Sequence, residues 1–460
     1  MGKNSETICA IATAQGGAIG VIRVSGPDAI PAVNSIFSKD ISNAKGYTLH
    51  YGQITGTPPR GSGEGALDDV ILSIFRAPHS YTGEDSVEIS CHGSRYIQQQ
   101  ILELLKDNGC QMAAPGEFTQ RAFLNGKMDL TQAEAVADLI ASQNASQHRV
   151  AMNQLRGGIK TRLEQLRDKL LHLTSLMELE LDFSDHEELE FADRSEVLSI
   201  GQQIEDEIRH LLHSFEQGNA IKQGIPVAII GAPNVGKSTL LNQLLQDDKA
   251  IVSDIAGTTR DVIEDTVYIT SPNNVGGTPP RGSGEGALLR FIDTAGIRHT
   301  DDVIENLGIE RSLKAAEQSR IIILMNEPGV PFPDLSDLQS PFPSGEGRGE
   351  ASIIRITNKT DQFSALNGIG IDELKQQILD AIKDEEQPDV VVNARHKESL
   401  EQALTDIRRA IQALNDDVPT DLVAEDLRLC ISHLSEIVGK ELMDPNTVLG
   451  NIFKHFCVGK

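Results

Sequence analysis

The residues with the clearest chemistry lie in the run Gly231–Ser238, which reads Gly-Ala-Pro-Asn-Val-Gly-Lys-Ser. This run matches the phosphate-binding pattern G-x-x-x-x-G-K-[ST] at every fixed position. The apolar run Val227–Ile230 before it predicts a buried strand, and Ser238–Asn242 predicts the start of a helix. In that setting backbone N–H groups surround the phosphates of a nucleotide. Lys237 adds a positive charge and the Ser238 hydroxyl can bind Mg²⁺. A glycine turn without a ligand is the alternative, which the strand–loop–helix context disfavours.

Three further motifs follow in the order that a guanine-nucleotide site requires. A threonine in Gly257–Asp261 can reach Mg²⁺, and Asp293–Gly296 can hold the metal's water and contact the γ-phosphate. The carboxylate that ends Asn358–Asp361 can accept hydrogen bonds from the guanine N1–H and 2-amino groups, a donor pair that adenine lacks. Ser364 and Ala365 would complete the base pocket. The expected GTP-binding residues are Asn234, Val235, Gly236, Lys237, Ser238, Thr239, Thr258, Thr259, Asp293, Thr294, Ala295, Gly296, Asn358, Lys359, Asp361, Ser364 and Ala365.

The residue that follows the Asp-Thr-Ala-Gly motif is Ile297. Ras-like proteins carry a glutamine there, which orients the attacking water, and an isoleucine cannot do so. Asp301, Asp302 and Glu305 follow closely. These acidic side chains either position the water or form a solvated acidic loop.

Asn234 lies inside the phosphate-binding run. Its amide oxygen can bind a monovalent cation beside the phosphates. Such a cation would offset the charge that develops during hydrolysis, where other GTPases use an arginine finger.

Several elements must position these residues. Residues 7–118 alternate short strand-like runs with glycine turns, as in Gly20–Val24 and Asp69–Phe75, and a helix is predicted over Arg95–Asn108. Residues 131–213 follow a helical pattern. Its apolar stripe consists of Leu163, Leu166, Leu170, Leu173 and Leu176.

The second half of the chain changes pattern twice. Residues 220–385 alternate strands and helices, which is typical of a nucleotide-binding α/β domain. Residues 393–456 are helical again, with Leu400, Leu404, Ile407 and Ile411 expected on one face. The simplest architecture is therefore a helical domain that the α/β domain interrupts.

One twelve-residue segment occurs twice: Gly56–Leu67 is identical to Gly277–Leu288. A partial copy lies in Ser344–Glu350. The copies lack the regular spacing and apolar pattern of a structural repeat. We expect solvent-exposed loop insertions, because closure entropy grows slowly with loop length; a shared ligand-binding role is the alternative. Deleting Gly277–Ala287 is expected to leave nucleotide hydrolysis nearly intact.

Composition is that of an ordinary globular protein of about three domains. Of 460 residues, 23% are charged and 39% hydrophobic, and the formal net charge is −26. This acidity argues against a general nucleic-acid-binding surface, so any RNA contact needs a local patch or a partner. The five cysteines form no C-x-x-C pair, which favours neither a zinc site nor disulfides. Without a signal peptide or membrane-length apolar run, a cytoplasmic location is expected.

Three long stretches carry a family resemblance: Ala77–Gly93, Ala114–Leu130 and Phe456–Lys460. With them, the chain resembles the MnmE (also called TrmE) tRNA-modification GTPases over nearly its full length. The resemblance implies a multidomain protein with α/β and all-α parts. These would be an N-terminal α+β folate-binding-like domain that dimerises (1–125), a discontinuous helical domain (126–218 and 386–460) and an inserted P-loop GTPase domain (219–385).

The resemblance also implies an activity. Together with the flavoprotein MnmG, the family installs an aminomethyl or carboxymethylaminomethyl group at C5 of the tRNA wobble uridine. A folate, 5-formyltetrahydrofolate or a relative, supplies the one-carbon unit. The partners would be a second copy of the chain, MnmG in a heterotetramer, and tRNA. The positions that match the family's folate contacts are Arg23, Glu88, Lys127 and Lys460.

For the GTPase domain the resemblance implies activation by K⁺. Ser238 and Thr259 would hold Mg²⁺, and Glu305 would position the water. The K⁺ ligands would be Asn234, Ser253, Ile255 and Thr258, and Ser253 also joins the GTP-binding residues. Cys457 would either take part in catalysis or be an ordinary buried thiol.

The chain departs from the family pattern at three sites. Ser94 occupies the place of a second glycine after Cys91-His92-Gly93. Only two residues separate Asp361 from Ser364, where the family usually has another strand's worth of chain, and the segment Met325–Glu350 is irregular. We therefore expect a rearranged base-binding side. A ribosome-assembly GTPase and a folate-binding scaffold with a non-hydrolysing GTPase domain are the alternative functions.

Overall fold

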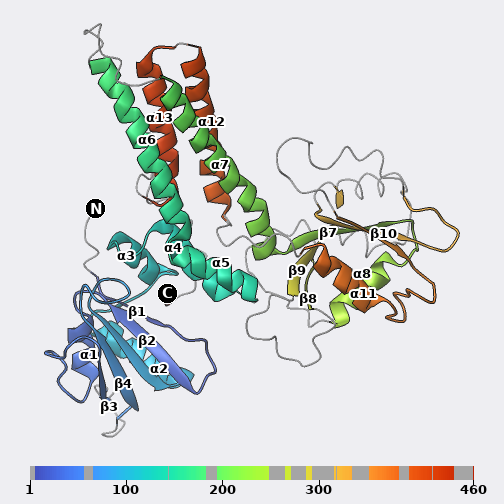
Figure 1. Ribbon diagram of the computed structural model, residues 1–460. Coiled ribbons are helices and arrows are strands. Elements are labelled where there is room, and N and C mark those ends of the chain that lie inside the picture. The colour runs from blue at the N-terminus through green and yellow to red at the C-terminus, as the bar shows by residue number, and fades with distance from the viewer. Residues whose placement is uncertain are drawn as a thin grey trace. The chain divides into compact units, whose positions relative to one another are not determined.

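The computed structural model describes residues 6–55, 66–142, 144–182, 194–247, 265–270, 286–292, 315–316, 319–333, 352–382, 393–416, 418–439 and 459. The chain divides into two compact units (Figure 1). The N-terminal unit comprises Met1–Ala141, Leu155–Gly157 and Ser435–Lys460, and the second unit comprises Ser142–Gln154 and Gly158–Leu434. Among the described residues, no helix combines the length and apolar character that a membrane span needs.

A six-stranded sheet forms the centre of the N-terminal unit, in the order β3-β4-β5-β2-β1-β6. All neighbouring strands are antiparallel except β1 and β6. The two strand-like runs expected from the sequence lie in β2 and β4, which confirms them. The strands are β1 (Ile8–Ile11), β2 (Ile19–Ser25), β3 (Thr48–Ile54), β4 (Asp68–Phe75), β5 (Ser86–His92) and β6 (Gln111–Met112).

Helices cover one face of this sheet. The apolar sides of α1 (Ala29–Ile36) and α2 (Arg95–Asp107) pack on inward-facing residues of β2, β4 and β5. On the opposite face, α3 (Glu117–Leu124) places Phe118 against Ile8 and Ala10 of β1. Side chains alternate between faces along a strand, so the polar residues of β2 and β5 share this second face with α3.

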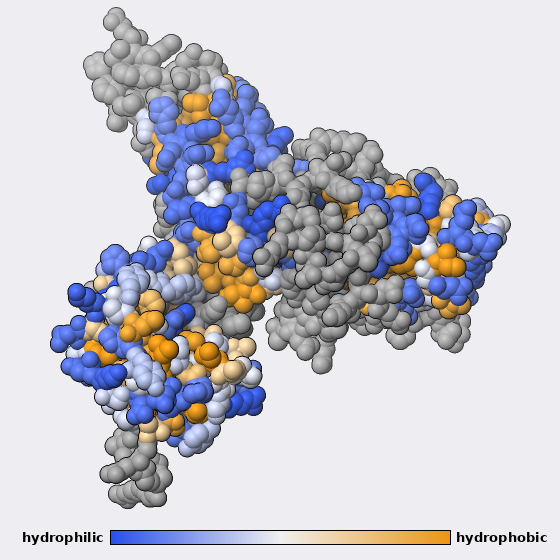
Figure 2. Space-filling view, turned by 60° about the horizontal axis from the view of Figure 1, so that its bottom comes forward, coloured by the Kyte–Doolittle hydropathy of each residue, from blue (hydrophilic) through white to orange (hydrophobic). Residues whose placement is uncertain are grey.

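An apolar strip lies at the β3 side of the sheet. It consists of Tyr47, Leu49, Tyr51 and Ile71, whose exposed fractions are 72%, 71%, 62% and 44%. Tyr51 and Ile71 are paired across the strands. Figure 2 shows such apolar patches interrupting the polar surface of this unit.

The outer edge of β3 is capped by the segment that follows α1. The Ser38 N–H donates to the Gln53 carbonyl at 2.9 Å, and the Ser38 hydroxyl accepts from the Gln53 N–H at 2.9 Å. Lys39 Nζ donates to the Tyr51 carbonyl at 2.6 Å. The Tyr51 carbonyl and both backbone groups of Gln53 are therefore used within the chain.

Long helices follow the N-terminal sheet. They are α4 (Leu130–Ala141), α5 (Ala145–Leu155), α6 (Gly158–Asp182), α7 (Arg194–Gln223), α12 (Ala394–Asn415) and α13 (Thr420–Ile437). In the second unit, α7 packs against both α6 and α12 (Figure 1). The expected stripe of α6 is buried at Leu163, Leu166, Leu170 and Leu173; the side chain of Leu176 is outside the described part.

The interior face of α12 differs from the expected one. Leu400 and Ile407 are buried, as expected, but Leu404 and Ile411 are only half-buried. Ala403, Ala410 and Leu414 complete the buried face. Small alanines allow close approach of neighbouring helices. The spacing of large apolar residues in the sequence does not indicate these positions.

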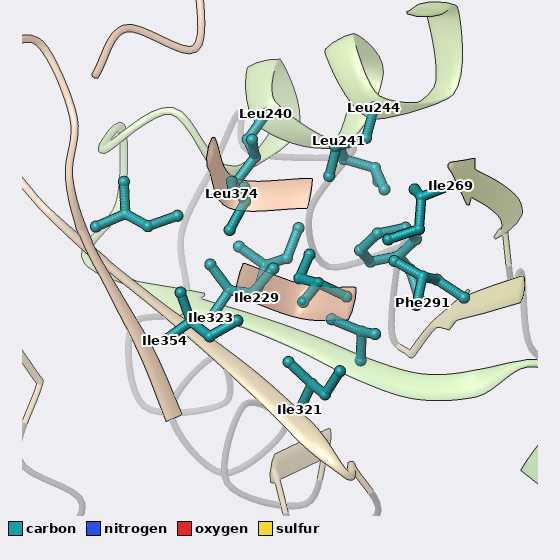
Figure 3. Close-up of a cluster of buried hydrophobic side chains, with 14 of the residues drawn as sticks. Ile229, Leu240, Leu241, Leu244, Ile269, Phe291, Ile321, Ile323, Ile354 and Leu374 are labelled. Atoms are coloured by element: carbon teal, nitrogen blue, oxygen red, sulfur yellow. The ribbon is translucent and has the colours of Figure 1, made fainter. Parts of the chain in front are cut away.

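The second unit also contains a five-stranded sheet in the order β11-β10-β7-β9-β8, parallel except for β8. Its strands are β7 (Ile225–Gly231), β8 (Asp265–Thr270), β9 (Gly286–Phe291), β10 (Ile321–Asn326) and β11 (Ser352–Thr357). Helices α8 (Lys237–Asp247) and α11 (Ile371–Asp380) pack on one face. Figure 3 shows Leu240, Leu241 and Leu374 pointing toward Ile229, Ile323 and Phe291 of the sheet. This arrangement confirms the expected α/β pattern.

The sheet ends at β11 within the described residues 352–382. A short turn, and not a strand, connects Asp361 to Ser364. Phe363 is buried in the core between the sheet and α11. The shortened segment noted in the sequence therefore does not open the core around Phe363.

The first copy of the twelve-residue segment follows β3 and precedes β4, and the second follows β8 and continues into β9. The structure corrects one expectation. Gly286, Ala287 and Leu288, the last three residues of the second copy, belong to β9, where they pair with Thr270, Ile269 and Tyr268. The end of the second copy is therefore strand, and the deletion to Ala287 would shorten the sheet. Ser344–Glu350 lies outside the described residues.

Candidate functional site

The phosphate-binding loop connects β7 to α8, in the strand–loop–helix order that the sequence predicts. Asn234 and Gly236 both have positive φ angles, 63° and 100°. A Cβ atom at Gly236 would overlap the side-chain amide of Asn358. Glycine is therefore required here for two reasons, the left-handed backbone and the close approach of a second segment.

Lys237 is the first residue of α8, and its ammonium lies against the loop. Nζ donates to the carbonyls of Gly231 at 2.7 Å and of Ala232 at 2.9 Å. Burial lowers the pKa of this ammonium below its ordinary value of 10.5. Ser238 follows in the first turn of the helix, where exposed N–H groups and the helix dipole favour anions. The loop thus combines a cation, a hydroxyl and a helix N-terminus.

Asn358 connects the loop to the segment after β11. Its Nδ2 donates to the Val235 carbonyl at 2.7 Å, and its Oδ1 accepts from the Ala365 N–H at 3.0 Å. The side chain is buried. Ala365 is therefore linked to the loop through Asn358, so the expected rearrangement does not separate these two segments. Asp361 is exposed, with its carboxylate accessible to a ligand.

Lys359 lies between two segments at the same end of the sheet. Its φ angle is 62°, and Nζ donates to the Asn234 carbonyl at 3.4 Å. Nζ also forms an ion pair with Glu327, the residue after β10. Glu327 lies outside the sequence motifs. It reaches Lys359 because the neighbouring parallel strands β10 and β11 end together.

The remaining expected residues of this site are outside the described part of the chain. They are Ser253, Ile255, Thr258, Thr259, Asp293, Thr294, Ala295, Gly296 and Glu305. Val235 is buried in the core, and Thr239 is half-buried in α8.

A second group of expected residues meets on the α3-covered face of the N-terminal sheet. Arg23 of β2 and Glu88 of β5 are directly paired across the strands. The Arg23 Nε and Nη2 atoms donate to Glu88 Oε1 at 3.0 and 2.8 Å. The guanidinium lies 5.4 Å from the ring centre of Tyr81 and 5.6 Å from that of Phe118. This arrangement is a cation beside a carboxylate, between two aromatic faces.

Lys127 contacts the loop that carries Tyr81. Its Nζ donates to the Pro78 carbonyl at 2.9 Å, and its aliphatic stem lies beside Gly83. The Tyr81 hydroxyl is 2.9 Å from the Thr119 hydroxyl, and burial raises the pKa of Tyr81. Lys127 is thus connected to Arg23 through this loop rather than directly.

A buried arginine fixes the same loop to α3. Arg121, whose side chain is 2% exposed, forms ion pairs with Glu117 at 2.8 Å and with Glu84 at 3.3 Å. Its Nη1 also donates to the Glu6 carbonyl at 2.8 Å. The loop that presents Tyr81 to Arg23 is therefore held at its base by charge-assisted hydrogen bonds.

Sequence reasoning missed Tyr81 and Phe118. Both lie within the long stretches that carry the family resemblance, which was the available signal. The two C-terminal residues with expected roles lie outside the described residues. They are Cys457 and Lys460. Gly459 between them is described, and its carbonyl accepts from Arg23 Nη1 at 3.4 Å.

A parallel sheet with a glycine-containing loop before α8, and an Asn-Lys-Thr-Asp segment bonded to that loop, defines the class of P-loop GTPases. Two family models cover most of the chain: "MnmE helical domain" over residues 130–457 and "GTP-binding protein TrmE N-terminus" over residues 7–127. The chain belongs to the MnmE (TrmE) family of tRNA modification GTPases.

Relatives named "tRNA modification GTPase MnmE" align over almost the whole chain. The one from Parabacteroides distasonis is 52% identical, covering 99% of this chain and 100% of its own length. The one from Flavobacterium johnsoniae is 43% identical with the same coverage. Among solved structures, a crystal structure of an Aquifex aeolicus Era variant bound to GDP.AlF4- matches with 25% identity and a TM-score of 0.22, covering 39% of this chain and 65% of that one.

Proposed function

We propose that this chain is a K⁺-activated GTPase that works with the flavoprotein MnmG on tRNA. Together they would install an aminomethyl or carboxymethylaminomethyl group at C5 of the wobble uridine, with a folate supplying the one-carbon unit. The functional domains would be residues 1–125, 126–218 with 386–460, and 219–385. The observation that carries the GTPase part is the pair of hydrogen bonds by which Asn358 donates to the Val235 carbonyl of the loop and accepts from the Ala365 N–H.

The loop residues suggest how GTP would be used. Lys237 would neutralise the outer phosphates, Ser238 would bind Mg²⁺ together with Thr259, and Asp361 would accept hydrogen bonds from the guanine. The positive φ of Asn234 places this residue in the bend of the loop. It would bind K⁺ together with Ser253, Ile255 and Thr258, and K⁺ would supply positive charge beside the phosphates.

The N-terminal site supports the folate part of the proposal. Arg23 offers a cation, Glu88 a carboxylate, and Tyr81, a residue that is 37% exposed, an aromatic ring. These are groups that suit the carboxylates, the polar pterin edge and the ring system of a folate. Lys127 and Lys460 would add cations for the glutamyl tail. We also propose a homodimer of N-terminal domains, which the exposed apolar strip supports.

A comparison of GTP hydrolysis in K⁺ and Na⁺ tests the GTPase part. Faster turnover in K⁺ is expected, and an Asn234→Ala variant should lose the difference. Equal rates in both salts would rule out the cation role. The Glu305→Ala variant should retain GTP binding and hydrolyse about 10²–10⁴-fold more slowly.

Mass analysis of wobble uridines in cells that lack this protein tests the tRNA part. Loss of the C5 modification is expected. Unchanged wobble uridines together with a ribosome-assembly defect would favour the ribosome-assembly alternative. Intact modification by a variant that cannot hydrolyse GTP would favour the folate scaffold.

A further inference from the structure

An acidic residue outside the nucleotide motifs contacts the base-binding segment. β10 and β11 are parallel, with Asn326 paired to Thr357, so the residues that follow them lie at the same edge of the sheet. Glu327 follows β10, and its Oε1 atom forms an ion pair with Lys359 Nζ. The same ammonium donates to the Asn234 carbonyl of the phosphate-binding loop at 3.4 Å. Lys359 thus bridges Glu327 and the loop.

The backbone around Glu327 is fixed by a tight turn. The Val330 N–H donates to the Glu327 carbonyl at 3.0 Å, with Pro328 at the second position and Gly329, φ 83°, at the third. This is the pattern of a type II turn. Asn326 Nδ2 also donates to the Val330 carbonyl at 2.8 Å. The carboxylate is therefore presented from a defined position rather than from a mobile loop.

Lys359 needs the support of the Glu327 carboxylate because its own backbone conformation is unusual. Its φ angle of 62° is in the left-handed region, which residues other than glycine occupy only where their surroundings stabilise it. The neighbouring side chains point elsewhere: Asn358 is bonded to Val235 and Ala365. The end of the Lys359 side chain is thus held by the ion pair with Glu327 and by the hydrogen bond to the Asn234 carbonyl.

We propose that Glu327 is a positioning residue for guanine nucleotides, which acts by orienting Lys359 over the base-binding side of the loop. This inference rests on the proposed nucleotide site. It implies a role in affinity and not in the hydrolysis step, because Lys359 belongs to the base-binding segment Asn358–Asp361, whereas Lys237 belongs to the phosphate-binding loop. Both side chains are partly exposed, at 55% for Lys359 and 32% for Glu327, so the effect is moderate.

The test uses the full-length chain and a fluorescent GDP analogue in stopped-flow binding. Glu327→Gln should weaken GDP binding about two- to fivefold, mainly through faster dissociation. The KM for GTP should rise by a similar factor while the turnover rate at saturating GTP keeps its wild-type value. Glu373→Gln, which removes an exposed carboxylate from the first turn of α11, is the matched control and should change neither constant.

A double-mutant cycle with Lys359→Met separates positioning from general electrostatics. Methionine keeps most of the stem and removes the charge. If Glu327 acts through Lys359, then Glu327→Gln has no further effect in the Lys359→Met background, and the wild-type difference shrinks at about 1 M salt. Tighter GDP binding by Glu327→Gln, or an equal loss in both backgrounds, would overturn the proposal.

Two further readouts keep the outcome unambiguous. Thermal unfolding compares the stability of the variants with that of the wild type. Glu327→Asp, which retains the charge on a shorter side chain, should recover part of the lost affinity. A fall in turnover at saturating GTP with unchanged KM would also overturn the positioning role. Failure of the wild-type chain itself to bind GDP would instead contradict the proposed nucleotide site.

Discussion

The guanidinium of Arg23 donates a hydrogen bond to the carbonyl of Gly459 at 3.4 Å, so the penultimate residue of the chain lies against β2. The same guanidinium forms the ion pair with Glu88. Gly459 has a φ angle of 96°, and a Cβ atom there would overlap the Ile11 carbonyl. The close approach of residue 459 to the N-terminal sheet therefore depends on a glycine at this position.

The first prediction follows from this contact. Gly459→Ala should displace the tail, because alanine both resists the left-handed backbone and overlaps Ile11. We expect 5-formyltetrahydrofolate to bind about tenfold more weakly in a calorimetric titration. Gly109→Ala is the matched control, since Gly109 has a φ angle of 89° with open space around its Cβ position. Equal affinities for the Gly459 variant and the wild type would show that Gly459 does not contribute to the proposed folate site.

The second prediction concerns the stability of the N-terminal unit. Arg121→Met would leave Glu84 and Glu117 without their buried partner, which should lower the free energy of unfolding by about 3–5 kcal/mol. Tyrosine fluorescence during urea unfolding can measure this change, because the chain has no tryptophan and four of its five tyrosines, all except Tyr268, lie in this unit. Arg95→Met, at an exposed position on α2, should change stability by no more than about 0.5 kcal/mol.

The third prediction is a pH dependence of nucleotide binding. Burial lowers the pKa of Lys237, and only the ammonium form attracts phosphate. Affinity for GDP should therefore fall as the pH rises, and the fall should begin below 10.5, where a free lysine is still protonated. The free energy of unfolding changes in the opposite direction. The unfolded chain binds the Lys237 proton more tightly than the folded chain does, so stability rises with pH between the lowered pKa and 10.5.

Binding isotherms between roughly pH 8 and pH 10 measure the effect, after correction for nucleotide ionisation. Lys237→Arg keeps its charge over this range, so any affinity that it retains should not show the alkaline fall. A wild-type dissociation constant that stays constant over the range would contradict the assignment.

The fourth prediction uses the boundary of β9. Removing residues 277–285 leaves every residue of β9 in place and should preserve GTP hydrolysis. Removing 277–287 also takes Gly286 and Ala287, whose pairing with β8 would be lost. We expect the longer deletion to lower the melting temperature of the GTPase domain and to reduce its activity. Identical melting temperatures for the two deletions would show that this end of β9 does not support the sheet.

Local patterns were sufficient for much of the fold. The helix expected over Arg95–Asn108 is α2, Arg95–Asp107, and the phosphate-binding loop lies between a strand and a helix as its flanking residues predict. In both cases the signal comes from residues that are near each other in the sequence. The half-buried position of Ile411 on α12 does not follow from such local patterns. Its side chain lies 3.2 Å from the Cβ position of Gly201 on α7, a contact that spacing along one helix does not reveal.

The functional residues divide in the same way. Lys237 and Ser238 belong to a contiguous motif, so the sequence alone locates them. Arg23 taken alone resembles an ordinary surface charge, and only the family resemblance selected it. Its surroundings, Tyr81 and Phe118, come from a loop and a helix that are remote in the sequence. Glu327 belongs to no sequence motif, because its proposed role depends on β10 and β11 ending side by side.

The capped edge of β3 restricts how the apolar strip can meet another molecule. With the carbonyl of Tyr51 engaged by Lys39 and both backbone groups of Gln53 engaged by Ser38, a foreign strand cannot extend the ladder there. The side chains of the exposed sheet face remain available for contact with another molecule. Capping of this part of the edge disfavours the open-ended fibres that uncapped apolar edges form.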